Sequence, residues 1–159
     1  MQPILKINLT TGTTEEFIVP KEWERDFLGG ASLAARILYP FLTKELDPLS
    51  PESPLLFLNG PLSGTSGPTT GRFVICGKSP ATNLWAESNI GGFWGPELRK
   101  TGYGGLWITG KSPSPVFLWI EEGRLEVRSA ANVWGKDVYE TQEIVKEGIG
   151  VKGARVAVI

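Results

Sequence analysis

The chain has 159 residues, of which 16 are Lys or Arg and 17 are Asp or Glu, so its formal net charge is −1. Hydrophobic residues make up 41% and charged residues 21%, a composition typical of one globular domain with a core of its own. The chain offers no basic field for nucleic acid or an anionic membrane, no apolar run long enough to span a bilayer, and no signal peptide at residues 1–4. We therefore expect a soluble, cytoplasmic protein with no nucleic-acid and no membrane partner.

The chain is predicted to start with two strands and two short helices. Residues 4–9 and 14–19 alternate around a glycine-containing turn, which is typical of a β-hairpin. Pro20 suits the first turn of a helix whose apolar face includes Leu28. A second helix is expected over 31–39, before a proline that ends or kinks it.

The remainder is predicted to mix short strands with turns and two more helices. In the last of these helices, Val138 is expected on the inner face. The elements expected after the second helix are strands over 55–58 and 73–76, a helix over 92–100, strands over 105–109, 116–121 and 125–128, a helix over 136–146 and a last strand over 154–159. Because no βαβ unit repeats, we predict an α+β fold with mixed or antiparallel β-sheets and a few short helices. Residues 1–159 are expected to form a single domain without an internal boundary.

Two glycine-rich loops, over residues 60–72 and 88–95, are the most informative feature of the chain. The first is rich in backbone N–H groups and hydroxyls and ends at Arg72, a set that can surround a phosphate or another polar acceptor. In the second, Ser88 or Asn89 is expected to cap the following helix, with glycines that allow a ligand to approach closely. Residue types alone leave another interpretation open for each loop: a surface turn for the first, and plain capping with tight packing for the second.

Few groups in the chain can carry out chemistry on a ligand. There is no histidine, which excludes a Ser-His or Cys-His nucleophile pair within the chain. Cys76 is the one cysteine, which excludes an internal disulfide and a cysteine cluster, and its place in an apolar strand indicates an inert buried thiol. Among six tryptophans, Trp85 and Trp94 flank the second loop and are the best candidates to stack on a flat ligand, although tryptophans are more often core residues.

Short motifs recur in order along nearly the whole chain. They are Asn8-Leu9-Thr10-Thr11-Gly12, Phe27-Leu28-Gly29-Gly30, Asp47-Pro48-Leu49-Ser50-Pro51-Glu52, Gly60-Pro61-Leu62-Ser63-Gly64-Thr65, Gly71-Arg72-Phe73, Lys78-Ser79-Pro80, Ser88-Asn89-Ile90-Gly91-Gly92, Gly95-Pro96-Glu97-Leu98-Arg99 and Val133-Trp134-Gly135-Lys136. Each is weak alone, but the ordered set is specific. In this set the chain resembles the N-terminal domain of the tungsten-containing aldehyde ferredoxin oxidoreductase family.

The resemblance implies a saddle of β-sheets that holds a bis-molybdopterin cofactor carrying tungsten, or molybdenum in its place. Carried over by position, Arg72, Asn89 and Gly91 would bind the pterin, with Gly92 beside them. In the family the metal oxidises aldehydes to carboxylic acids, and electrons pass through a [4Fe-4S] cluster to ferredoxin. The cluster ligands and the catalytic acid and base of the family lie in later domains, outside this chain.

The chain is therefore expected to be an incomplete N-terminal cofactor-binding domain that needs the remainder of the enzyme's polypeptide and does not oxidise aldehydes by itself. An apolar strand at the very end of the chain supports this expectation. Two other functions stay open. One is the active-site subunit of an aromatic acyl-CoA reductase of the same family, and the other is a non-catalytic binding or assembly domain with the same fold. The resemblance also allows a homo-oligomer.

Overall fold

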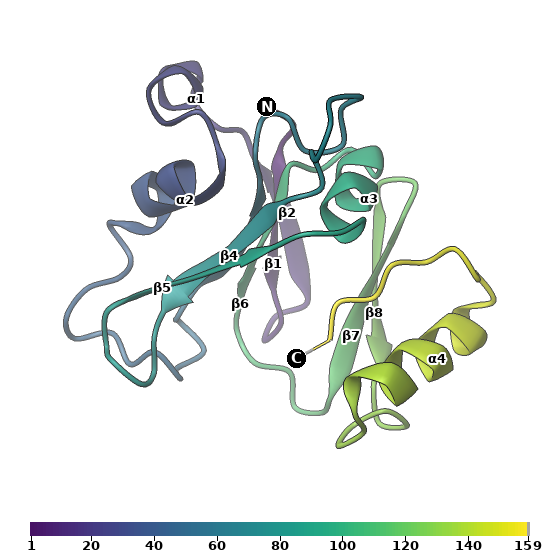
Figure 1. Ribbon diagram of the computed structural model, residues 1–159. Helices are drawn as coiled ribbons and strands as arrows, with labels where there is room; N and C mark the ends of the chain where they lie inside the picture. Colours follow the sequence, from purple (N-terminus) through teal and green to yellow (C-terminus); the bar gives the residue numbers. More distant parts are fainter. Residues whose placement is uncertain (159) are drawn as a thin grey trace.

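A computed structural model describes residues 1–158 of the chain (Figure 1). These residues form eight strands and four helices. In chain order they are β1 (Ile4–Asn8), β2 (Thr13–Phe17), α1 (Lys21–Phe27), α2 (Gly30–Leu38), β3 (Leu55–Asn59), β4 (Phe73–Lys78), β5 (Trp85–Ile90), α3 (Trp94–Lys100), β6 (Gly105–Thr109), β7 (Val116–Glu121), β8 (Arg124–Ser129) and α4 (Val138–Ile149). None of these helices is both long and apolar enough to cross a membrane.

Six of the strands form one mixed sheet in the order β2-β1-β6-β3-β4-β5. β1 and β6 run parallel, and the other neighbours in this sheet are antiparallel. β7 and β8 form a separate antiparallel hairpin. This arrangement confirms the predicted α+β class, and the expected N-terminal hairpin is β1–β2.

Both faces of the six-stranded sheet are covered. Because successive side chains of a strand point to opposite faces, Leu56 and Leu58 of β3 pack with Leu33 and Ile37 of α2, whereas Phe57 packs toward α3 and the β7–β8 hairpin. Figure 1 shows α1 and α2 on one side of the sheet, with α3 and the hairpin on the other. The sheet is therefore the middle layer, and the two glycine-rich loops lie at its upper end in this view.

A smaller core joins α4 to the hairpin. Val145 of α4 is buried there, and Phe117 of β7 packs against the same cluster. Asp137 caps the helix by accepting a 2.8 Å hydrogen bond from the backbone N–H of Glu140, and Gly150 ends it in the left-handed region with φ 72°. After this turn the chain runs back between α3 and α4 in the view of Figure 1.

The predicted helix cap at Ser88 or Asn89 is wrong. Both residues belong to β5, where Asn89 is paired with Val74 of β4 in the antiparallel ladder. α3 begins at Trp94, two residues later than expected, and no side chain caps it. The pairing with β4 decides this difference, because it extends to Ile90 and the helix starts only at Trp94. An N-cap residue directly precedes the first helical residue, and that position is Phe93.

Three other expectations fail at the ends of elements. Residues 154–158 form no strand, and Ile159, the last residue of the strand expected there, lies outside the described residues. Leu28 follows the last turn of α1 with φ 60° and is 67% exposed. Val138 is the first residue of α4 and is 47% exposed. A helical pattern predicts which residues share one face of a helix. It does not predict whether the core reaches the ends of that face, and here Leu28 and Val138 lie beyond the core.

The expected burial of Cys76 is confirmed. Its side chain is 1% exposed, in the cluster that β4 forms with α2. Burial raises the pKa of this thiol to about 12, with a further contribution from the nearby carboxylate of Glu87. The thiol is therefore protonated at neutral pH and acts as an apolar core group rather than as a nucleophile.

Lys78, at the end of β4, is a buried cation that is 8% exposed. Its ammonium group donates to the carbonyl oxygens of Thr43, Lys44 and Leu46, at 2.7, 3.2 and 2.6 Å. Three carbonyls thus replace the water that an exposed ammonium group would bind. The side chain holds the connection between α2 and β3 against the end of the sheet.

Lys78→Met keeps most of the side-chain length but removes all three donors. We expect it to lower the free energy of unfolding by about 1.5–3 kcal/mol, the range for a hydrogen bond to a charged group. Lys111→Met, at an exposed position, is the matched control. Thermal unfolding of the complete gene product and hydrogen exchange of residues 43–46 measure the effect. Equal melting temperature and equal exchange in the two variants would contradict the proposed role.

Candidate functional site

The two glycine-rich loops meet at one end of the β4–β5 ladder. The first connects β3 to β4, and the second consists of the end of β5 and its connection to the start of α3. The last residue of β5, Ile90, is paired with Phe73, the first residue of β4. The end of one loop and the start of the other are therefore neighbours. The contact is close, because a Cβ atom at Gly71 would overlap the carbonyl oxygen of Gly92. Only glycine at position 71 permits this approach of the two backbones.

An open pocket of about 380 Å³ lies where the loops meet. Its walls come from the end of the first loop, the start of the second and the beginning of α3. The lining residues are Thr69, Thr70, Gly71, Arg72, Gly91, Gly92, Phe93 and Pro96. A Cβ atom at Gly91 or Gly92 would have no heavy atom of the protein within 4 Å, so both glycines leave space that side chains would otherwise fill.

Arg72 and Asn89 form a hydrogen-bonded pair beside this pocket. Nη1 of Arg72 donates to Oδ1 of Asn89 at 2.8 Å, and both side chains are exposed. None of the ion pairs within residues 1–158 includes Arg72. Asn89 therefore orients the guanidinium group without neutralising it, and the remaining N–H donors of Arg72 can bind an anionic or polar ligand.

Asn59, the last residue of β3, connects the first loop to the start of α3. Its side chain is 2% exposed, accepts a hydrogen bond from Oγ of Ser63 at 3.0 Å and donates from Nδ2 to the carbonyl oxygen of Gly95 at 3.0 Å. The fit around this amide is tight, because a Cβ atom at Gly95 would lie 2.7 Å from Oδ1 of Asn59. A buried amide with both ends hydrogen-bonded fixes the relative position of its partners.

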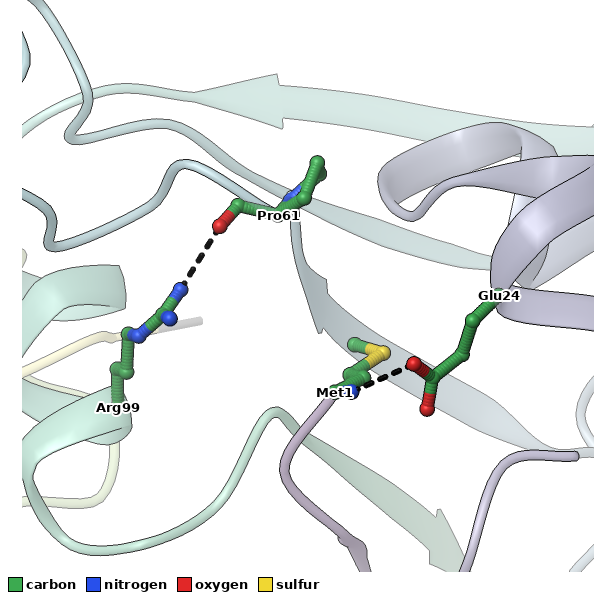
Figure 2. A network of polar contacts seen from close by, with 4 residues as sticks. All are labelled: Met1, Glu24, Pro61 and Arg99. Carbon is green, nitrogen blue, oxygen red and sulfur yellow. Dashed lines mark hydrogen bonds and ion pairs between the residues drawn. The ribbon is translucent and has the colours of Figure 1, made fainter. Parts of the chain in front are cut away.

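Arg99 of α3 adds a second connection to the first loop. Its Nη1 atom donates to the carbonyl oxygen of Pro61 at 3.0 Å (Figure 2) and to that of Ser63 at 2.9 Å. Figure 2 also shows the ion pair between the Met1 ammonium group and Glu24. Met1, Glu24 and Arg99 line a second, smaller hollow. Because α3 follows the second loop, Arg99 and Asn59 together hold the two loops at a set separation.

The first loop is also closed on itself. The backbone N–H of Gly64 donates to the carbonyl oxygen of Thr70 at 2.9 Å, and the Thr70 hydroxyl donates to the carbonyl oxygens of Thr65 and Gly67, each at 3.0 Å. The Thr70 hydroxyl, one of the groups that could have bound a ligand, is therefore engaged within the loop. The loop is therefore ordered by its own hydrogen bonds, which lowers the entropy that a ligand would otherwise have to remove.

The structure brings the four predicted site residues together. Arg72, Gly91 and Gly92 line the pocket, and Asn89 is joined to it through Arg72. The two tryptophans chosen as stacking candidates are not in the lining. Trp85 lies at the far end of β5, paired with Lys78, and Trp94 packs between Phe57 and Phe73, with ring centroids 5.6 and 4.7 Å away.

Sequence reasoning missed Asn59, Ser63 and Arg99. A polar residue directly after the apolar run 55–58 was a usable signal for Asn59, because a polar side chain at the end of a buried strand needs partners. Nothing in the sequence indicated that its partner would be the backbone of Gly95 in α3. Residues 1–158 also contain no group of three or more Cys, Asp or Glu side chains placed to share a metal ion.

A family model described as the N-terminal domain of aldehyde ferredoxin oxidoreductase matches residues 4–159. The chain belongs to this family. The resemblance inferred from the ordered motifs is thereby confirmed.

Aldehyde ferredoxin oxidoreductases that carry tungsten are among its similar relatives. The protein of Pyrococcus abyssi is 41% identical over 98% of this chain and 26% of its own length, and that of Pyrococcus horikoshii is 39% identical over the same shares. The WOR-like subunit of an aliphatic sulfonate oxidoreductase of Pyrococcus furiosus is 35% identical over 87% of this chain and 23% of its own length. The chain thus spans about a quarter of the length of these relatives.

A solved structure has the same fold as this aldehyde ferredoxin oxidoreductase domain. It is the active site complex BamBC of benzoyl coenzyme A reductase in complex with 1,5-dienoyl-CoA. The TM-score is 0.92 at 36% sequence identity, over 96% of this chain and 23% of the other. The fold is therefore shared by relatives whose names indicate different substrates.

Gly71→Ala tests the close contact between the loops. The added methyl group overlaps the Gly92 carbonyl, so we expect the loops to separate and the free energy of unfolding to fall by about 1–3 kcal/mol, as in other overpacked sites. Gly148→Ala, in α4 with open space around it, is the control and should leave stability unchanged or raise it slightly. Thermal unfolding of the complete gene product compares them. A Gly71→Ala melting temperature equal to that of the control would refute the contact.

Proposed function

We propose that this chain binds the pterin part of a tungsten bis-molybdopterin cofactor, in an enzyme that oxidises aldehydes to carboxylic acids and passes the electrons to ferredoxin. Membership of the family and the names of the relatives support the tungsten cofactor and the aldehyde substrate. The observation that carries the proposal is the convergence of Arg72, Gly91 and Gly92 on one open pocket. Arg72 is distant in the sequence from Gly91 and Gly92, and the β4–β5 ladder brings them together.

The residues around the pocket fit the chemistry of a pterin that bears a phosphate. A pterin presents flat faces, ring edges with amide-like donors and acceptors, and an anionic phosphate. The open space at Gly91 and Gly92 lets a flat group lie against backbone amides. Arg72 offers a planar charged group of the type that binds phosphate or a ring edge. Oδ1 of Asn89 is engaged by Arg72, which leaves its amide nitrogen to donate to the ligand.

In this proposal, the chain binds and orients the cofactor but does not carry out the redox step. When bound, the metal–pterin group supplies the two-electron oxidation of the aldehyde. Arg72 and Asn89 hold the pterin, and the two loops keep their separation through Asn59 and Arg99. A [4Fe-4S] cluster needs several thiolate ligands, and the chain has Cys76 alone, so its ligands must come from residues outside this chain. The rest of the enzyme and ferredoxin are accordingly its proposed partners.

A second function, reduction of an aromatic acyl-CoA, is favoured by one observation. The benzoyl coenzyme A reductase complex matches this chain with a TM-score of 0.92. In this proposal the pocket would hold the cofactor in either enzyme, so its residues do not separate the two substrates. Assays of the complete gene product with aliphatic and aromatic aldehydes and with benzoyl-CoA distinguish them: turnover of benzoyl-CoA alone would favour the second function.

Substitution of Arg72 and Asn89 tests cofactor binding. A hydrogen bond to a charged group contributes about 1.5–3 kcal/mol, so Arg72→Ala should weaken cofactor binding by roughly 10- to 150-fold. Asn89→Ala should have a smaller effect, because it removes one neutral donor and the orientation of Arg72. The measurement is tungsten and pterin per polypeptide in the purified complete gene product.

Arg124→Ala, an exposed arginine of the β7–β8 hairpin, is the control for these variants. It should retain the cofactor content of the unmodified protein. Normal content in both Arg72→Ala and Asn89→Ala would show that these loops do not bind the cofactor. Absence of tungsten, molybdenum and pterin from the unmodified protein would instead favour the non-catalytic binding or assembly domain.

A further inference from the structure

A second arginine contacts the wall of the pocket from the other end of the chain. The guanidinium carbon of Arg155 lies 4.8 Å from the ring centroid of Phe93, and Phe93 is one of the lining residues. We propose that Arg155 is a further cofactor-binding residue, which supplies a second positive charge for the phosphate-bearing part of the cofactor. This inference rests on the proposed function.

The position of Arg155 is supported by the packing of its neighbour. Val156 packs against the buried cluster formed with Val145 of α4, and the N–H of Ala154 donates to the carbonyl oxygen of Val151 at 3.1 Å. Val156 thus anchors this segment in the α4 core, and the guanidinium group of its neighbour Arg155 lies over the ring of Phe93.

Stacking on Phe93 leaves Arg155 able to bind an anion. A guanidinium group over an aromatic face keeps its N–H donors in the plane of the group, free for hydrogen bonds at the edge. Arg155 is exposed, and none of the ion pairs within residues 1–158 includes it. The acidic residue of α3, Glu97, forms an ion pair of 2.8 Å with Lys100.

Two guanidinium groups that form no ion pair within residues 1–158 therefore stand at one pocket, Arg72 in its lining and Arg155 on Phe93. A neutral ligand would gain little from these two charges. A group with two negative charges, such as a phosphate, can accept hydrogen bonds from both guanidinium groups. The charge arrangement thus favours the phosphate end of the cofactor at this wall.

The test compares Arg155→Gln, Arg155→Lys and the control Arg124→Gln in the complete gene product, purified with its cofactor. Each variant is incubated in rising concentrations of KCl, and tungsten and pterin that remain bound after gel filtration are measured. We expect Arg155→Gln to lose cofactor at least fivefold faster than the control. Its rate should also depend less steeply on salt, because one charge–charge contact is gone. Arg155→Lys should recover most of the retention, and melting temperatures of the cofactor-free variants should be equal.

The results separate this inference from the proposed function. If the unmodified protein holds tungsten and pterin but Arg155→Gln and Arg124→Gln lose it at the same rate with the same salt dependence, Arg155 has no role in binding. If Arg155→Gln loses cofactor faster with an unchanged salt dependence and a lower melting temperature, the residue is structural, which also overturns the inference. If the unmodified protein holds no cofactor, the proposed function itself fails.

Discussion

The side chain of Asn59 joins the end of the middle sheet layer to the first glycine-rich loop and to the beginning of α3. Its two hydrogen bonds, to Ser63 and to the Gly95 carbonyl, lie in the interior, where an amide without partners would be costly. The constraint is also steric, because any side chain at Gly95 would collide with this amide. With the start of α3 fixed in this way, Arg99 one turn later is in reach of the first loop.

The shape of the pocket follows from these contacts and from the β4–β5 ladder. The ladder brings the ends of the two loops together, and the missing side chain of Gly71 lets their backbones touch. The walls are therefore largely backbone, and the charge comes from guanidinium groups such as Arg72. Such a site is suited to a polar, flat ligand, and its lining residues include no carboxylate or thiol. A domain that held only the cofactor would be compatible with relatives named for aldehydes, sulfonates and benzoyl-CoA.

Much of this could be predicted where local pattern decides the structure. The alternation in residues 4–9 and 14–19 predicted the first hairpin, and the pattern over residues 31–39 predicted the second helix. The site residues were predicted from the ordered motifs. Residue types alone left each loop with two interpretations. Asn89 was predicted to cap a helix, whereas it lies in a strand. Both places suit a polar residue before glycines, and only the partner strand decides between them. Asn59, Arg99 and Arg155 could not be predicted as partners, since each contact joins segments whose distance depends on the whole fold.

In the proposed function, the two loops form one wall of a pterin site. The decisive experiment is a crystal structure of the complete gene product with its cofactor, with the metal located from its anomalous scattering. We expect pterin or phosphate atoms within hydrogen-bonding distance of the Arg72 guanidinium group and in contact with the backbone at Gly91 and Gly92. A fully occupied metal–pterin group that touches neither loop would contradict this expectation.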